Sequence, residues 1–238
     1  MQLDILAFGA HPDDVELSAC GTLMKAISQG KKVGIVDLTK GELGTRGTAE
    51  TRAIEAAEAA KILGIDVRVN LGMRDGFFQN DEENQRLIIE QIRRFRPKVV
   101  LANAVSDRHP DHSKGAKLVA DACFLSGLRR IETSFDGIAQ EAFRPTAIYH
   151  YVQEQYLNPD FVVDVTPFYD RKMEAIKAYS TQFFDASSKE PATPISGEKY
   201  LDYITGRMVQ YGRSINVNYA EGFTTARIPG IEDLFDLL

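Results

Sequence analysis

The chain has 238 residues, of which 44% are apolar and 26% are charged, an ordinary balance for a globular protein. Its formal net charge of −6 weighs against nucleic acid and anionic membranes as partners, because these attract basic surfaces. No apolar run approaches the roughly 20 residues of a membrane span, and the opening stretch MQLDILAFGA lacks the basic segment and cleavage site of a signal peptide. We therefore expect a cytoplasmic protein that binds neither nucleic acid nor a membrane.

The first predicted elements alternate between strand and helix. Apolar runs without polar alternation, typical of strands buried on both faces, occur at residues 3–10, 32–39, 67–72 and 99–105. Segments with helical spacing or helix-favouring composition follow them at residues 15–30, 49–64, 80–96 and 112–127. Thr48 is expected to cap the second helix, and Asn80, three residues before Glu83, resembles the start of a capping box. Cys20 and Cys123 lie in apolar stretches and are predicted to be buried free thiols.

The remaining chain adds strands and helices to the same pattern. Strands are predicted at 147–152 and 161–166, helices at 167–183 and 198–212, and a loop at 187–197. Thr166 and Pro167 suit the cap and first residue of the 167–183 helix. The alternation predicts an α/β fold, with a Rossmann-like, mostly parallel sheet flanked by helices. We expect a single domain spanning residues 1–238, whose C-terminal third covers the sheet edge.

Two polar clusters follow predicted strands, which is where open α/β sheets bind their ligands. HPDD (residues 11–14) follows the first strand, SDRHPDH (residues 106–112) follows the fourth, and together they hold three of the four histidines. Adjacent aspartates also commonly cap helices, and HPDH could form a polar turn, so each loop alone supports a structural role as well. Their combination favours a metal site at the carboxyl ends of the strands. His150 lies in an apolar strand and is interpreted as a hydrogen-bonded core residue.

Two imidazoles and one carboxylate, with a position left for water, make a catalytic zinc site. The residues that can supply this set are His11, Asp14 and His112. Such a site lowers the pKa of bound water toward about 7, and the same ligands accept Fe²⁺ or Co²⁺. Asp13 could then act as general base, and His109 as a cation that stabilises an oxyanion or protonates the leaving group. Asp111 could hold the His109 ring and raise its pKa.

AHPDDVE at residues 10–16 and HPDH at residues 109–112 together resemble the PIG-L/LmbE-like zinc-dependent N-deacetylases, which act on N-acetylglucosamine derivatives. The resemblance extends to residues 41–64 and to YAEGF at residues 219–223, so it covers most of the chain. Within the family, TRGTAETR and YSTQF are similar to the branch that removes acetate from N-acetylglucosaminyl malate in bacillithiol biosynthesis.

The resemblance implies roles for individual residues. The zinc ligands that it implies are His11, Asp14 and His112, with Asp13 as general base, His109 as the charged partner and Asp111 as the residue that orients His109. The substrate contacts that it implies are Arg52, Arg108 and Tyr200, the tyrosine as an oxyanion contact. Arg52 could instead form a surface salt bridge with Glu55, which would contribute little. The resemblance also implies a homo-oligomer, with a hexamer among the possible assemblies.

Two other functions stay open at this point. One is a related amidase of the same family that acts on thiol S-conjugates or on chitooligosaccharides. The other is a non-catalytic protein that binds a sugar or a metal, although such a protein would need no base beside its ligands. For the deacetylase and for the related amidase, the expected small-molecule partner is an N-acetylated amino sugar.

Overall fold

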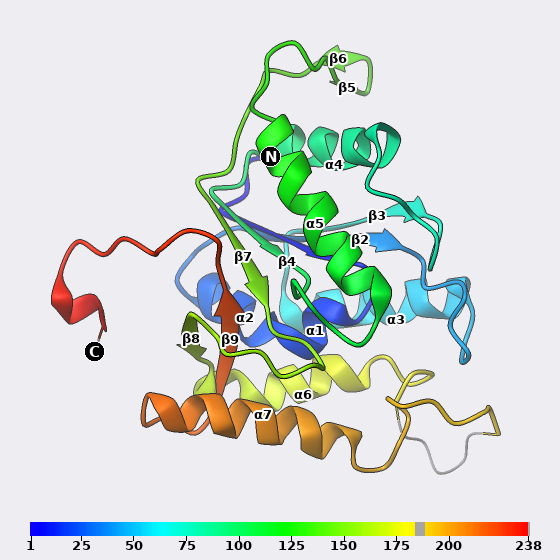
Figure 1. Ribbon diagram of the computed structural model, residues 1–238. Helices are drawn as coiled ribbons and strands as arrows, with labels where there is room; N and C mark the ends of the chain where they lie inside the picture. Colours follow the sequence, from blue (N-terminus) through cyan, green and yellow to red (C-terminus); the bar gives the residue numbers. More distant parts are fainter. Residues whose placement is uncertain (184–188, 238) are drawn as a thin grey trace.

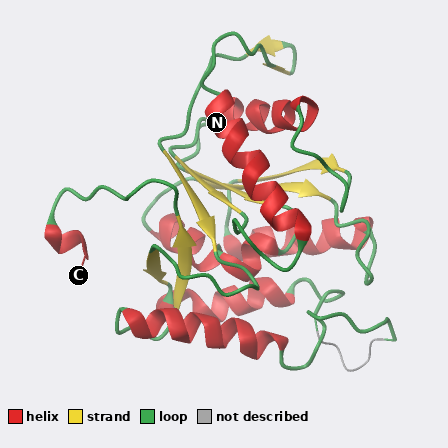
Figure 2. Ribbon diagram, viewed as in Figure 1, coloured by secondary structure: helices red, strands yellow, loops and turns green. Residues whose placement is uncertain are grey.

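The computed structural model describes residues 1–183 and 189–237, and a mostly parallel sheet lies at its centre (Figures 1 and 2). Within these residues the sheet has seven strands in the order β3-β2-β1-β4-β7-β9-β8. Their bounds are β1 (Ile5–Gly9), β2 (Val33–Thr39), β3 (Val67–Met73), β4 (Val99–Ala102), β7 (Ala147–Tyr151), β8 (Phe161–Asp164) and β9 (Ala220–Thr224). β9 is antiparallel to both its neighbours, and the pairs from β3 to β7 are parallel. The predicted α/β fold is confirmed.

Helices cover both faces of this sheet (Figure 1). Their bounds are α1 (Asp14–Ser18), α2 (Cys20–Ser28), α3 (Ala49–Leu63), α4 (Glu82–Phe95), α5 (Pro110–Leu125), α6 (Tyr169–Lys177) and α7 (Tyr200–Ser214), with 3₁₀ turns η1 (Thr166–Phe168) and η2 (Leu234–Leu237). α4 and α5 share one buried apolar cluster with the sheet, and α1, α2, α3 and α6 contribute to a second cluster on the other face. A two-stranded hairpin, β5 (Ser134–Phe135) and β6 (Ile138–Ala139), follows α5.

Several predicted helix boundaries are corrected. Thr48 caps α3 by accepting from Thr51 N, as expected, but α4 is capped by Asp81 rather than Asn80. The helix predicted over 112–127 is α5, and it starts at Pro110, two residues earlier than predicted. The segment predicted as one helix over 167–183 is η1 followed by α6, which ends at Lys177. The first two residues of the predicted 187–197 loop lie outside the described residues. Both cysteines are buried and free, as predicted.

The helix predicted over 15–30 is interrupted at Ala19, which separates α1 from α2. The cause lies about 200 residues away along the chain, in β9. The Glu221 carboxylate accepts from the backbone N–H groups of Gly21 (2.9 Å) and Thr22 (2.7 Å), in the first turn of α2. An acidic side chain at this position also interacts favourably with the helix dipole. β9 therefore fixes where α2 begins.

Glu221 forms a fully buried ion pair with Lys172 of α6. The Lys172 ammonium lies 2.7 Å from Glu221 Oε1 and donates to the Leu17 carbonyl at the end of α1, and both charged side chains are about 1% exposed. The pair joins α6, β9 and the break between α1 and α2. The C-terminal third of the chain thus supports the loop that carries the HPDD cluster.

Lys172→Ala leaves the Glu221 carboxylate buried without its cation. We expect the free energy of unfolding to fall by about 3 kcal/mol or more, the usual cost of breaking one half of a buried pair. Equilibrium unfolding in urea measures this loss. Lys177→Ala, an exposed lysine on the same helix, is the matched control and should change stability by less than about 0.5 kcal/mol. A loss of less than about 1 kcal/mol for Lys172→Ala would show that the backbone donors alone suffice for Glu221.

Candidate active site

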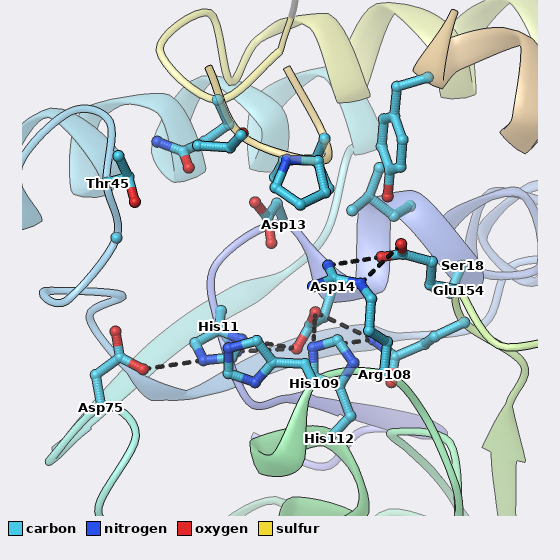
Figure 3. A pocket seen from close by; sticks show the side chains of 18 of the residues that line it. His11, Asp13, Asp14, Ser18, Thr45, Asp75, Arg108, His109, His112 and Glu154 are labelled. Atoms are coloured by element: carbon cyan, nitrogen blue, oxygen red, sulfur yellow. Dashed lines mark hydrogen bonds and ion pairs between the residues drawn. The ribbon is translucent and has the colours of Figure 1, made fainter. Parts of the chain in front are cut away.

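The site lies at the carboxyl ends of the parallel strands, in a cavity of about 420 Å³. His11, Asp13 and Asp14 follow β1, and His109 and His112 lie at the amino end of α5, after β4 (Figure 3). β1 is paired with β2 on one side and β4 on the other, so the connections leave its end in opposite directions and open a crevice there. The two polar loops predicted to meet at this edge do meet.

Three imidazole rings form the floor of the cavity. Ring centroids are 4.7 Å apart for His11 and His109, 5.1 Å for His109 and His112, and 5.6 Å for His11 and His112. The Asp14 carboxylate lies between two of them, 3.0 Å from His112 Nε2 and 3.7 Å from His11 Nδ1. Asp14 and His11 are buried, and His112 is 9% exposed.

Each of the two rings beside Asp14 is held from behind by another carboxylate. His11 Nε2 lies 3.0 Å from Asp75 Oδ1, and His112 Nδ1 lies 2.5 Å from Asp107 Oδ2. These contacts leave His11 Nδ1 and His112 Nε2 facing Asp14. A carboxylate behind an imidazole fixes the ring and its tautomer, and this arrangement accompanies most metal-ligating histidines.

The Asp14 carboxylate is itself oriented by amide donors. Its Oδ2 accepts from Asn103 Nδ2 (2.9 Å) and the His11 N–H (2.9 Å), and its Oδ1 accepts from Gln153 Nε2 (3.1 Å). Burial acts to raise the pKa of Asp14, but the imidazoles of His112 and His11 hold it well below its usual range. Asp14 is therefore an anion in a fixed orientation.

The charges around the imidazoles favour a divalent cation. Five carboxylates surround the three imidazole rings: Asp13, Asp14, Asp75, Asp107 and Asp111. The cations bonded to them are Arg52 and Lys114. Burial lowers the pKa of His11, but its bonds to Asp111 and Asp75 outweigh burial and raise the value to about 10. Without a metal, protons on the imidazoles balance the negative charge of these carboxylates. A divalent metal can take the place of those protons, so this donor set fits a zinc-type ion.

Asp13 lines the same cavity as the imidazoles, and its backbone is left-handed, with φ of 119°. Its carboxylate lies 2.6 Å from the Arg52 guanidinium, which also donates to the Pro12 carbonyl. Burial raises the pKa of Asp13 to about 7, although Arg52 acts to lower it. The carboxyl therefore titrates near neutral pH at the edge of the cavity. The predicted alternative pairing of Arg52 with Glu55 is wrong, because Glu55 binds Ser180 and Thr181 instead.

The structure corrects the expected link between Asp111 and His109. The Asp111 carboxylate accepts from Gly76 N (2.7 Å) and Lys114 Nζ (2.9 Å), whereas the His109 ring is held by the Asp111 backbone N–H. His109 Nδ1 accepts this bond, so the neutral ring carries its proton on Nε2. Burial, followed by His11 and His112, lowers the pKa of His109, although Asp111 acts in the opposite direction. The bond that Nδ1 accepts and the lowered pKa both favour the neutral ring over the predicted cation.

The mouth of the cavity carries the remaining predicted residues, Arg108 and Tyr200. The Arg108 guanidinium forms two hydrogen bonds of 2.8 Å with Glu154, and both side chains are partly exposed. Tyr200, the first residue of α7, lines the same cavity, and burial raises the pKa of its hydroxyl. Arg207, half-buried in the same lining, is bonded to the backbone carbonyls of Gln153 and Leu17.

Several residues of the site were not predicted from the sequence. Asp75 follows β3 and Gln153 follows β7, and Asn103 directly follows β4. All three stand at strand ends, so the same rule that selected the two histidine loops could have found them. His150 behaves as predicted, since it is buried and its Nδ1 donates to the Asn103 carbonyl.

Comparison with known proteins places this site in a family. Residues 6–123, about half of the chain, match the PIG-L family, described as GlcNAc-PI de-N-acetylase. The crystal structure of the conserved protein TT1542 from Thermus thermophilus has 35% sequence identity and a TM-score of 0.86, covering 98% of this chain and 99% of that one. The chain belongs to the PIG-L family.

The curated relatives include enzymes named as deacetylases and one named as a hydratase. Diacetylchitobiose deacetylase of Thermococcus kodakarensis is 26% identical over 95% of this chain and 84% of its own length. A probable N-acetyl-α-D-glucosaminyl L-malate deacetylase of Bacillus anthracis is 28% identical over 75% of this chain and 81% of its own. A 4-oxalmesaconate hydratase of Pseudomonas putida is 25% identical over 76% and 74%. The chain is an N-deacetylase, a hydrolase of amide bonds, and the non-catalytic alternative is set aside. No helix within residues 1–183 and 189–237 is long and apolar enough to cross a membrane.

Asp107→Asn tests the carboxylates that hold the imidazoles. The change removes the charge behind His112 and should weaken metal binding about 10- to 100-fold. Competition with a chromogenic chelator measures the affinity. Asp160→Asn is the matched control, because this exposed carboxylate also accepts a backbone N–H, from Thr225, but lies outside the site. Equal affinities for the two variants would contradict the role given to Asp107.

Proposed function

We propose that the chain removes the acetyl group from a small N-acetylglucosamine derivative by adding water to the amide carbonyl. The observation that carries this proposal is geometric: Asp14 lies between the imidazoles of His11 and His112, and a second buried carboxyl, Asp13, lines the same cavity. Burial raises the pKa of Asp13 to about 7. A base near neutral pKa beside a metal-type donor set is what hydrolysis of an unactivated amide requires.

We assign His11, Asp14 and His112 as the metal ligands, with Zn²⁺ as the expected ion and Fe²⁺ or Co²⁺ as alternatives. A divalent metal held there supplies a water of lowered pKa and polarises the amide carbonyl. Asp75 and Asp107 hold the imidazoles of His11 and His112 in the orientation proposed for metal binding. Asn103 and Gln153 do the same for Asp14.

Asp13 is proposed to take a proton from the attacking water as the new C–O bond forms. Its bond with Arg52 holds the carboxylate in one orientation, so the role proposed for Arg52 is to position this base. The protonated Asp13 then delivers its proton to the departing amine, and the C–N bond breaks to release acetate. Because His109 is neutral in this arrangement, its Nε2–H is proposed to donate to the oxyanion, together with the Tyr200 hydroxyl. Asp111 orients His109 through its backbone.

N-acetylglucosaminyl malate is the particular substrate that the sequence resemblance favours. With its acetamide group at the imidazoles, its malate carboxylates are proposed to lie at the mouth of the cavity. Arg108 is the cation proposed to bind them, since arginine recognises carboxylates through two parallel hydrogen bonds. The relative from Bacillus anthracis, a probable deacetylase of that conjugate, supports this assignment.

A neutral chitooligosaccharide is the second candidate, and the pairing of Arg108 with Glu154 favours it. Each of the three arginines that line the cavity already has a partner in the protein: Asp13 for Arg52, Glu154 for Arg108, and backbone carbonyls for Arg207. A dianionic substrate would have to displace Glu154, whereas a neutral sugar would not. The relative from Thermococcus kodakarensis acts, by its name, on diacetylchitobiose.

Replacing the two adjacent aspartates separately tests the assigned roles. Asp13→Asn should retain bound metal and lose turnover by about 10²-fold or more, because a general base contributes about 10²–10⁴-fold. Asp14→Asn should lose metal. Metal content by mass spectrometry and amine release from N-acetylglucosaminyl malate and diacetylchitobiose measure both. Turnover that survives in Asp13→Asn would exclude Asp13 as the base. The proposal as a whole is tested with the wild-type enzyme: if it hydrates 4-oxalmesaconate and releases no amine, the proposed deacetylation is wrong.

Glu154→Gln separates the two candidate substrates. The change frees Arg108, so kcat/KM for the malate conjugate should rise about tenfold relative to diacetylchitobiose, the value of one charge-assisted hydrogen bond of ~1.4 kcal/mol. Glu58→Gln, which removes the same charge from an exposed pair with Lys61 on α3, is the control. An unchanged ratio would show that Arg108 does not contact the part of the substrate that differs.

A further inference from the structure

Two helices from opposite ends of the chain, α1 and α7, contribute neighbouring residues to the lining of the active-site cavity. Ser18 is the last residue of α1, and Tyr200 and Arg207 come from α7 (Figure 3 labels Ser18). Ser18 follows Asp14 by four residues, so the two side chains lie on the same face of α1. Tyr200 and Arg207 are separated by about two helical turns and likewise share a face of α7. We call Ser18, Tyr200 and Arg207 the α1–α7 wall.

Arg207 carries a positive charge that no carboxylate of the described residues balances. Its guanidinium donates to the backbone carbonyls of Gln153 and Leu17, which are neutral, and it takes part in no ion pair within the described part of the chain. Arg52 and Arg108, which line the same cavity, are each paired with a carboxylate. Burial outweighs the more distant charges and lowers the pKa of Arg207. A partly buried cation without a counterion favours binding of an anion from the cavity.

Ser18 offers an unused hydroxyl at the same place. The residue is 4% exposed, and its Oγ forms no hydrogen bond with the residues that the structure describes. Arg207 donates to the carbonyl of Leu17, which brings the guanidinium to the end of α1 where Ser18 stands. Buried hydroxyls nearly always have a partner, and serine can direct its hydroxyl to a new acceptor by rotation about one bond. An acceptor that enters here gains hydrogen bonds from both residues.

The group that suits a guanidinium beside a hydroxyl is a carboxylate, whose two oxygens accept hydrogen bonds and whose charge balances the arginine. The proposed deacetylation, on which this inference rests, supplies one carboxylate itself, because the amide oxygen becomes an oxygen of acetate when the amine departs. The Tyr200 hydroxyl, proposed to donate to that oxygen, belongs to the same wall. A second source is an acidic substituent of the sugar.

We propose that Ser18 and Arg207 form a carboxylate subsite beside Tyr200, which holds either the acetate product or an acidic group of the substrate. The carbonyls of Gln153 and Leu17 leave further N–H groups of the guanidinium for this ligand. The subsite is distinct from Arg108, whose guanidinium is occupied by Glu154.

Calorimetric titration of the metal-loaded protein with acetate and with L-malate tests the subsite, and acetamide is the neutral probe of the same shape as acetate. Arg207→Gln should weaken binding of at least one acid about tenfold, the value of one charge-assisted hydrogen bond, and leave acetamide binding unchanged. Ser18→Ala should weaken binding of the same acid about threefold. Its thermal midpoint should not fall, because the change removes a hydroxyl that had no partner.

The matched controls should leave these affinities unchanged. Arg213→Gln removes an exposed arginine from the same helix as Arg207. Thr22→Val removes a hydroxyl that is also buried and without a partner among the described residues, but that lies outside the lining of the cavity.

Kinetics of amine release identify the source of the carboxylate. If the subsite holds the acetate product, inhibition by added acetate should weaken about tenfold in Arg207→Gln, with no change in the ratio of kcat/KM for N-acetylglucosaminyl malate to that for diacetylchitobiose. If it holds an acidic group of the substrate, this ratio should fall about tenfold and acetate inhibition should stay constant.

Two results would overturn the proposal. Unchanged binding of both acids in Arg207→Gln and Ser18→Ala would exclude a carboxylate at this wall. An equal loss of acetate and acetamide binding in Arg207→Gln would show that the arginine only supports the carbonyls of Leu17 and Gln153. A wild-type enzyme that binds the acids through these residues but releases no amine would instead contradict the proposed deacetylation and support the subsite.

Discussion

Asn103 is the residue on which the geometry of the site depends. It is fully buried at the end of β4, and its side chain accepts from Ala10 N (2.9 Å) while donating to Asp14 and Gln153. Its carbonyl accepts from His150 on β7. One amide thus joins the ends of β1, β4 and β7. Because all of these groups are buried and hydrogen-bonded, any other arrangement would leave a polar group without a partner, so the Asp14 orientation is set by the sheet rather than by a loop.

The strand order explains how substrate recognition can vary around this fixed centre. The family match covers residues 6–123, which contain all of β1 except Ile5, the strands β2 to β4 and the three imidazoles. The mouth of the cavity is completed by residues 193–195 and by Tyr200 and Arg207 of α7, which lie beyond it. Part of the cavity lining therefore lies outside the segment that the family match covers. Relatives of this chain act on different molecules, as their names record.

Local sequence patterns predicted the features that local physics determines. Apolar runs located the parallel strands, and the rule of strand ends located His11 and His112 at one edge. The break at Ala19 could not be predicted, because it depends on Glu221 from the far end of the chain. The antiparallel strand β9, AEGFT, escaped prediction because glutamate and glycine disfavour strands. The ion pair between Arg52 and Asp13 could not be predicted either, because it depends on how α3 packs over the HPDD loop.

The same packing explains how two adjacent aspartates come to differ. Successive residues of one chain usually share an environment, but the left-handed backbone at Asp13 turns its carboxylate toward Arg52 and leaves Asp14 facing the imidazoles. Burial then raises the pKa of Asp13, while the imidazoles lower that of Asp14. Environments that push the pKa values of two carboxyls apart give them different chemical roles. A left-handed conformation is costly for a residue with a side chain, and glycine would remove that cost. Glycine would also remove the carboxylate that we propose as the base. The chain therefore keeps an aspartate at position 13 despite the cost of its left-handed backbone.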